Sequence, residues 1–168
     1  MLRPEWIPSA YADNDKPIIR QATIADMDTL LQFEQGVVEA ERLFTPRMKE
    51  GPAKYYDFDW LIKSPEAYLA VAELNGGLIG SGYARLVSSK PYLDHPQHAY
   101  LGFMFVVPQY RGKGVNRLII EALKQWAVSK SITELRLEVY NENLLAIKAY
   151  EKFGFDRYLL EMRMGIVQ

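Results

Sequence analysis

The chain has 168 residues, with 20 lysines and arginines against 21 aspartates and glutamates, and a formal net charge of −1. Hydrophobic residues make up 49% of it and charged residues 24%, a globular composition that excludes disordered, collagen-like and coiled-coil classes. The absence of cysteine excludes disulfides, thiolate metal sites and cysteine nucleophiles. The balanced charge lacks the basic surplus of a general nucleic-acid-binding protein, so we expect no nucleic-acid partner.

The length predicts one domain, at roughly 150 residues per domain. Residues 1–16 show no periodicity, and we interpret them as an N-terminal extension to a single domain over 17–168. The first residues lack the apolar segment of a targeting signal. The longest apolar run, 99–107, is far shorter than the roughly 18 residues of a membrane span. We therefore expect a cytoplasmic protein with no membrane partner.

Hydrophobic periodicity in the first third of the chain predicts a strand followed by helices. Residues 17–21 are typical of a short strand. Thr23 and Asp26 have the spacing of a capping box, and apolar residues at helical spacing follow from Ile24 to Val38. Residues 41–63 combine proline and glycine with aromatic residues, so we expect a short second helix among loops.

From Tyr68 the periodicity becomes that of strands. Asn75-Gly76-Gly77 predicts a hairpin turn, because Asn-Gly tolerates positive φ angles. The expected elements are strands over 68–74, 78–87 and 98–107, an amphipathic helix over 115–126, a strand over 134–140, a helix over 144–152 ending at Gly154, and a last strand over about 157–164.

The turn between Val106 and Asn116 carries the most informative local pattern. A buried strand ends at Pro108, two glycines follow, and a helix begins within a few residues. Such a turn directs several backbone N–H groups into one small space, and the helix N-terminus adds a partial positive charge that suits a diphosphate. A plain strand-to-helix connection with a solvated basic surface is the alternative. The pattern lacks the third glycine of a Rossmann fingerprint, because Arg117 stands there, and Gly-Lys-Ser/Thr of a P-loop is absent.

Two motifs together resemble those of the GNAT superfamily of acyl-CoA-dependent N-acetyltransferases, over residues 18–164. The first is the cofactor motif Arg/Gln-x-x-Gly-x-Gly/Ala, here residues 111–116, in which Asn116 replaces the usual small residue. The second is Asn-x-x-Ala-x-x-x-Tyr-x-x-x-Gly-Phe, present as Asn143, Ala146, Tyr150, Gly154 and Phe155.

The resemblance implies an α+β fold of three layers. Its central sheet would be mixed and mostly antiparallel, flanked by helices. A splayed pair of parallel strands, one ending at Val107 and the other over 134–140, would admit the pantetheine arm of the cofactor between them.

The resemblance also implies transfer of an acetyl group from acetyl-CoA to a primary amine of a small molecule or peptide, without a metal. The Val106 N–H would polarise the thioester carbonyl, and Tyr150 would protonate the departing thiolate as general acid. Asn143 would contact the pantetheine arm, cap the helix that follows, or do both. The residues implied to bind acetyl-CoA are Phe105, Val106, Val107, Arg111, Gly112, Lys113, Gly114, Val115, Asn116, Asn143 and Tyr150.

The general base is less well defined by the sequence. Many relatives place a glutamate four residues before the position of Val106, where this chain has Gly102. We take His98 as the candidate base, since a histidine titrates near neutral pH. Tyr100, Glu73 and Glu138 are further candidates.

Two other functions remain open from the sequence. The first is an acyl-CoA-binding sensor or partner subunit that no longer transfers the acyl group, which Gly102 and Asn116 would favour. The second is a purely structural domain. Acidic and aromatic residues in the first two helices and their loop, Glu34 and Tyr56 among them, would attract a cationic acceptor. A homodimer through exposed strand edges is also possible.

Overall fold

A computed structural model describes residues 16–166, so nearly all of the predicted extension over 1–16 lies outside the described residues. The chain divides into two compact units, the first ending at Glu138 and the second beginning at Val139. The two units are described separately.

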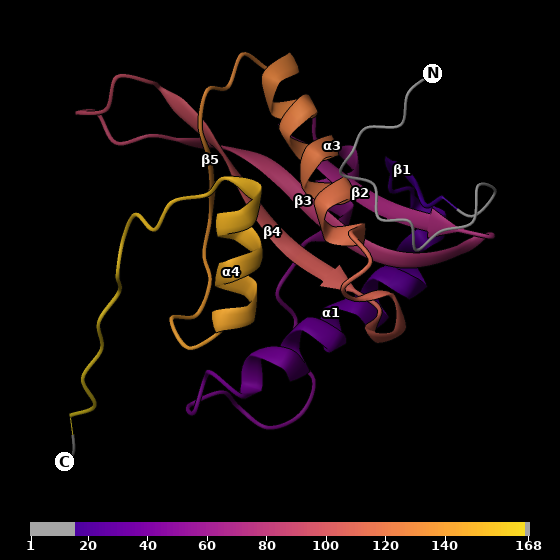
Figure 1. The fold of residues 1–168 in the computed structure, drawn as a ribbon, viewed down its shortest axis with the longest axis horizontal. Helices are drawn as coiled ribbons and strands as arrows, with labels where there is room; N and C mark the ends of the chain where they lie inside the picture. Colours follow the sequence, from indigo (N-terminus) through magenta and orange to yellow (C-terminus); the bar gives the residue numbers. More distant parts are fainter. Residues whose placement is uncertain (1–15, 167–168) are drawn as a thin grey trace. The chain divides into compact units, whose positions relative to one another are not determined.

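A five-stranded sheet forms the centre of the first unit (Figure 1). Its strands lie in the order β1-β2-β3-β4-β5. The first three pairings are antiparallel and β4 pairs with β5 in parallel, which confirms the predicted mixed, mostly antiparallel sheet. The strands are β1 (Ile18–Gln21), β2 (Ala67–Leu74), β3 (Gly77–Ser88), β4 (Gln97–Val106) and β5 (Leu135–Leu137).

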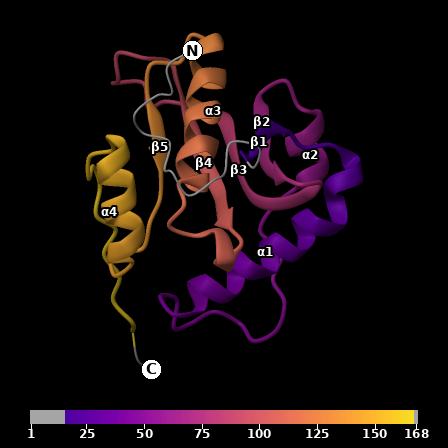
Figure 2. The same ribbon diagram turned by 45° about the vertical axis from the view of Figure 1, so that its right-hand side comes forward.

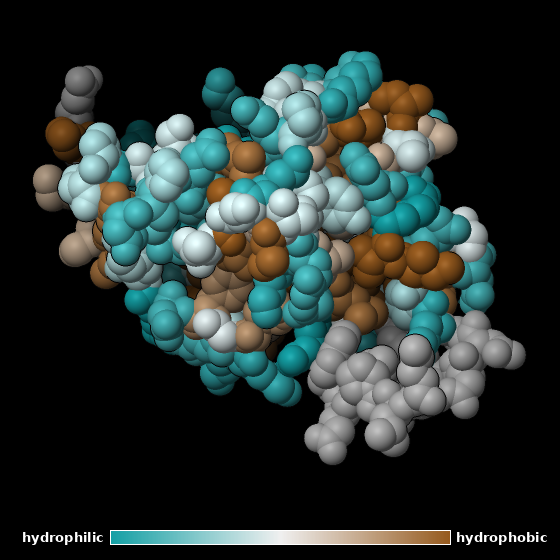
Figure 3. Space-filling model, turned by 90° about the horizontal axis from the view of Figure 1, so that it is seen from above, coloured by the Kyte–Doolittle hydropathy of each residue, from teal (hydrophilic) through white to brown (hydrophobic). Residues whose placement is uncertain are grey.

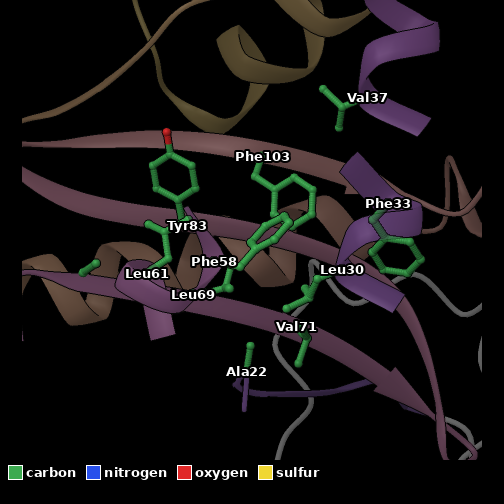
Figure 4. Packing of buried hydrophobic residues seen from close by; sticks show 11 residues of the cluster. Ala22, Leu30, Phe33, Val37, Phe58, Leu61, Leu69, Val71, Tyr83 and Phe103 are labelled. Atoms are coloured by element: carbon green, nitrogen blue, oxygen red, sulfur yellow. The ribbon is translucent and has the colours of Figure 1, made fainter. Parts of the chain in front are cut away.

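Helices cover both faces of this sheet (Figure 2). On one face lie α1 (Met27–Arg42) and α2 (Phe58–Lys63), and on the other lies α3 (Val115–Ser129). The main apolar cluster fills the space beneath α1 and α2, where the rings of Phe58 and Phe103 lie 5.0 Å apart between centroids (Figure 4). The three layers agree with the predicted α+β class.

A capping box starts the first helical segment, as predicted. The Asp26 carboxylate accepts a hydrogen bond of 2.8 Å from the Thr23 N–H, and the 3₁₀ helix η1 (Ile24–Asp26) leads directly into α1. The same carboxylate accepts two hydrogen bonds from the Arg20 guanidinium, at 2.8 and 2.9 Å. Arg20 also donates to Glu73 on β2, at 2.6 Å. This network fixes the start of α1 to the edge of the sheet.

The second unit contains α4 (Leu144–Phe153), which ends at Gly154 with a positive φ of 123°. The predicted last strand over 157–164 is wrong, because no residue from 154 to 166 lies in a strand. Alternating apolar residues favour an extended chain, but a strand forms only where a second backbone supplies hydrogen bonds. Here Leu159 and Met162 remain 87% and 85% exposed.

The predicted strand over 134–140 is shorter in the structure, where β5 comprises only three residues. Its parallel pairing with β4 ends at the pair Leu101–Leu137.

Figure 3 shows hydrophobic residues dispersed among hydrophilic ones on one face. Among the described helices, none has the length and apolar character needed to cross a bilayer.

We predict that Asp26→Asn lowers the free energy of unfolding by about 2 kcal/mol near neutral pH. Hydrogen bonds from Arg20 lower the pKa of Asp26 to about 2. The ionised side chain therefore contributes stability above about pH 4, and this contribution disappears as the pH falls towards 2. Urea unfolding from pH 7 to pH 2 measures the effect. Asp28→Asn, at an exposed position in the first turn of α1, is the control, and equal losses in both variants would contradict the role of the network.

Candidate functional site

A β-bulge in β4 shapes the part of the sheet that leads to the turn. Between the pairs Ser81–Phe105 and Tyr83–Gly102, one residue of β3 opposes two of β4. Phe103 adopts a positive φ of 56°, which is unusual for a non-glycine residue, and the Ser81 hydroxyl donates a buried hydrogen bond of 3.2 Å to its carbonyl. Strained backbone of this kind concentrates at functional sites.

The bulge changes which side chains share a face of the sheet. Phe103 packs against Phe58 beneath α2, and Phe105 packs against Phe33 of α1, with ring centroids 4.8 Å apart. Met104 lies on the opposite face, since its sulfur and Ile119 of α3 both border the space above Gly82. Simple alternation would have placed Met104, not Phe103, on the α1 face.

Beyond the bulge, β4 presents a backbone donor along its outer edge. The Val107 N–H donates to Ile79 of β3 at 2.9 Å, so the N–H and carbonyl of Val106 point away from β3. The Val106 carbonyl accepts a hydrogen bond of 2.9 Å from the Arg111 side chain. Pairing with β5 ends at Leu101, so among the described strands none pairs with the outer edge of β4 at Val106, and β3 pairs with the inner edge there.

The turn after β4 directs further N–H groups outward. The short 3₁₀ helix η2 (Pro108–Tyr110) is followed by Gly112 and Gly114, with positive φ angles of 73° and 83°. Gly114 is the N-cap residue of α3, and its carbonyl accepts the hydrogen bond from Leu118. Residues 111–114 form a turn, and among the described residues no N–H group of residues 112–116 donates a backbone hydrogen bond of normal geometry. These N–H groups form a set of donors at a helix N-terminus, suited to an anion.

Side chains add positive charge and one unsatisfied polar atom to this turn. Arg111 is exposed, and Lys113 lies over the Tyr110 ring with its Nζ 5.4 Å from the centroid. The Asn116 Oδ1 atom is buried and has no hydrogen-bond partner among the described residues. A buried unsatisfied amide at this position fits a site completed by a polar ligand.

In the second unit, Asn143 caps α4, where its side chain accepts a hydrogen bond of 3.2 Å from the Ala146 N–H. Tyr150 lies on the same helix, and its ring meets that of Phe155 edge to face, with centroids 5.9 Å apart. Burial raises the pKa of Tyr150 to about 12. The phenol therefore stays protonated at neutral pH.

His98 lies at the opposite end of β4 from the turn. It is eight residues before Val106, or about 26 Å along the strand at about 3.3 Å per residue. Its Nδ1 lies 3.1 Å from Ser89 Oγ, and the same hydroxyl lies 2.8 Å from His95 Nδ1. A general base must contact the acceptor amine near Val106 directly or through one water. At this distance we assign His98 no part in proton transfer.

The histidine cluster links three segments of the chain. His95 Nε2 lies 3.1 Å from the Glu134 carboxylate, which only accepts, so Nε2 is the donor in this contact. The Ser89 hydroxyl connects the two imidazoles, so a chain of polar contacts joins the β3–β4 loop to the residue before β5.

Comparison with known proteins agrees with this geometry. Residues 35–155 match the model of the acetyltransferase (GNAT) family. The chain belongs to the GNAT acetyltransferase family. One curated relative of this GNAT chain is an uncharacterized protein from Mycobacterium leprae, which is 32% identical over 97% of this chain and 41% of the relative. Another is an uncharacterized N-acetyltransferase from Methanocaldococcus jannaschii, which is 27% identical over 82% of this chain and 60% of the relative. The chain therefore spans about two fifths and three fifths of these relatives.

Solved structures share the GNAT fold with this chain. A mutant of the BH1408 protein from Bacillus halodurans has a TM-score of 0.81 at 20% identity and covers 89% of this chain and 99% of its own. A predicted acetyltransferase with acetyl-CoA from Clostridium acetobutylicum has a TM-score of 0.68 at 19% identity, with coverages of 88% and 96%. An aminoglycoside N-acetyltransferase, AAC(6')-Iy in complex with CoA, has a TM-score of 0.66 at 18% identity, with coverages of 89% and 100%.

Tyr83 is the residue of the GNAT chain that sequence reasoning missed. A Cβ atom added to Gly102 would lie 2.5 Å from the Tyr83 hydroxyl, so this phenol occupies the place of a side chain at position 102. Burial raises the pKa of Tyr83, which keeps the phenol protonated. The position of Tyr83 over Gly102 depends on the register between β3 and β4, so the sequence alone does not reveal it. Of the other candidate bases, Glu73 is engaged by Arg20, and Glu138 is exposed at the end of β5.

We predict that the His98 cluster makes stability depend on pH below 6.5. Burial, with Arg136 nearby, lowers the pKa of His98 in the folded chain below its unfolded value of 6.5. The unfolded chain then binds more protons, so the free energy of unfolding falls as the pH decreases through that range. Urea unfolding between pH 8 and 5 should show a shallower dependence for His98→Gln. Identical slopes in both proteins would contradict this.

Proposed function

We propose that this chain transfers an acetyl group from acetyl-CoA to a primary amine of a small molecule or peptide. The observation that carries the proposal is the set of N–H groups of residues 112–116, which donate no backbone hydrogen bond of normal geometry among the described residues and lie next to the outer edge of β4. These donors, with Arg111 and Lys113, would hold the CoA diphosphate, and the NH₂ group of Asn116 would donate to it, while the unsatisfied Asn116 Oδ1 would accept from a donor group elsewhere on the ligand. Acetyl-CoA supplies the thioester whose acyl group is transferred.

The free edge of β4 would bind the rest of the substrate. The pantetheine arm contains amide groups, which can pair with the backbone of Phe105, Val106 and Val107 as a strand would. The Val106 N–H then donates to the thioester carbonyl oxygen, where negative charge develops during attack. Because the sheet holds this donor in place, it needs no reorganisation when the amine reacts.

The bond changes follow from direct attack. The neutral amine nitrogen forms a bond to the carbonyl carbon, the carbon–sulfur bond breaks, the thiolate takes a proton, and the nitrogen loses one proton to solvent water to give the amide. We assign that proton to Tyr150, as the family resemblance implies; burial keeps the phenol protonated at neutral pH and also makes it a weaker acid than an exposed tyrosine. Asn143 would contact the pantetheine arm in addition to capping α4.

A second function is acyl-CoA binding without transfer, in a sensor or partner subunit. It is favoured by the protonated Tyr83 phenol, which fills the place of a side chain at position 102 and cannot accept a proton. Calorimetry with acetyl-CoA and release of CoA thiol in the presence of amines distinguish the two functions. Since the chain has no cysteine, thiol detection has no background from the protein. Absence of acetyl-CoA binding would reject both.

We predict that Lys113→Glu weakens acetyl-CoA binding about tenfold at low ionic strength, because it replaces a favourable charge beside the diphosphate with a repulsive one. Isothermal titration calorimetry at two salt concentrations measures the loss, which should shrink as salt increases. Lys124→Glu is the control, at an exposed position further along α3. If both variants bind equally well, the diphosphate lies elsewhere.

We predict that Tyr150→Phe lowers kcat at least tenfold and leaves the affinity for acetyl-CoA nearly unchanged, since only the proton donor is removed. Thiol release at saturating acetyl-CoA measures kcat, and calorimetry measures the affinity. Tyr158→Phe, which removes the hydroxyl of an exposed tyrosine, is the control. A variant with unchanged turnover from pH 6 to 9 would eliminate the acid role of Tyr150.

A further inference from the structure

A serine, a histidine and a glutamate form a connected series of polar contacts at the start of β4. Ser89 Oγ lies 2.8 Å from His95 Nδ1, and His95 Nε2 lies 3.1 Å from a carboxylate oxygen of Glu134, which comes from 39 residues further along the chain. Figure 1 shows the loop between β3 and β4, which carries Ser89 and His95, projecting from the end of the sheet opposite the turn before α3. The series is therefore separate from the proposed acetyl-CoA site.

The order of these groups is that of a nucleophile, its general base and the group that orients the base. A neutral His95 ring that donates from Nε2 to Glu134 presents the lone pair of Nδ1 to the Ser89 hydroxyl. That nitrogen can take the hydroxyl proton while the oxygen attacks an electrophile. A hydrogen bond from Arg136 lowers the pKa of the Glu134 carboxyl, which stays ionised at neutral pH and stabilises the imidazolium that forms.

Two further donors lie beside the Ser89 hydroxyl. The Nδ1 atom of His98, which is buried on β4, lies 3.1 Å from the same oxygen. With its proton on Nδ1, this ring donates to the oxygen and stabilises the charge that the oxygen gains as it loses its own proton. Among the described residues, the Lys90 N–H donates no backbone hydrogen bond of normal geometry. The N–H that follows a nucleophilic serine holds the oxyanion in one large class of serine hydrolases.

The series is accessible to small molecules from solvent. Ser89 is half-buried, and the side chains of His95 and Glu134 are 14% and 41% exposed. Lys90 and Pro96, at the two ends of the loop, are exposed. Because these groups lie on a loop and not in a deep cavity, the accessible substrates are small esters whose carbonyl carbon can reach the Ser89 oxygen.

We propose that Ser89 and His95 are the nucleophile and general base of a second active site, which hydrolyses esters of small carboxylic acids. The Ser89 oxygen forms a bond to the ester carbonyl carbon while its proton passes to His95 Nδ1, and the alcohol leaves with that proton as the carbon–oxygen bond breaks. Water then attacks the acyl-serine and gives a proton to His95, and the Ser89 oxygen regains this proton as the carboxylic acid is released. Glu134 is a positioning residue, because it acts through His95.

The test measures hydrolysis of p-nitrophenyl acetate without acetyl-CoA. We predict that Ser89→Ala and His95→Gln each lower kcat/KM about tenfold or more, since each removes a group that takes part in bond formation or proton transfer. Glu134→Gln should lower kcat about tenfold with KM unchanged, a split that a merely structural role would not produce. Ser88→Ala, at the exposed serine directly before Ser89, is the control and should keep the wild-type rate. Equal rates for the wild-type chain and Ser89→Ala would overturn the inference.

Covalent labelling of the wild-type chain with a fluorophosphonate gives a readout that does not depend on whether the variants fold. Mass spectrometry should locate the label on Ser89, and labelling of any other residue in its place would overturn the inference. Tyr150→Phe should hydrolyse the ester at the wild-type rate, whether or not the chain transfers acetyl groups. Loss of hydrolysis in Tyr150→Phe would assign the ester chemistry to the acetyl-CoA site and would also overturn the inference.

Discussion

Past Leu101, β4 pairs with a strand along one edge only among residues 16–166, and the chemistry that we propose depends on this. Hydrogen bonds to β3 fix the backbone of β4, including the pair formed by Val107 and Ile79. The next N–H back along the chain, that of Val106, must then face the unpaired edge. A backbone donor held by a sheet is oriented before any substrate arrives, and this is the condition under which such donors stabilise developing charge best.

The bulge at Phe103 changes which side chains of β4 lie on each face of the sheet. It places Gly102 and Phe103 on the same face, so the core beneath α2 receives an extra ring while Tyr83 covers the glycine. The unusual φ of Phe103 has a conformational cost, which the hydrogen bond from Ser81 and the packing of the ring against Phe58 offset. The packing of the core and the proposed site at the edge of β4 thus both depend on the bulge.

Charge is distributed unevenly along β4 although the whole chain is close to neutral. At the turn that follows the strand, backbone N–H groups, Arg111 and Lys113 make the surface attractive to an anion. On the other side of the bulge, the Arg85 guanidinium lies over the Tyr100 ring, with its Cζ 5.3 Å from the centroid.

The sequence by itself determined the features that depend on residues adjacent in the chain. These include the capping box at Thr23, the hairpin at Asn75-Gly76 and the glycine turn before α3, because caps and tight turns are set by local backbone preferences. Periodicity also gave the helices and most strands, and two motifs indicated the family. The tertiary structure alone decided the bulge at Phe103, the end of β4–β5 pairing, the position of Tyr83 over Gly102, the distance of His98 from the turn, and the lack of a strand over 157–164. Each of these depends on register or on the presence of a neighbouring backbone, which residues far apart in the sequence supply only once the chain has folded.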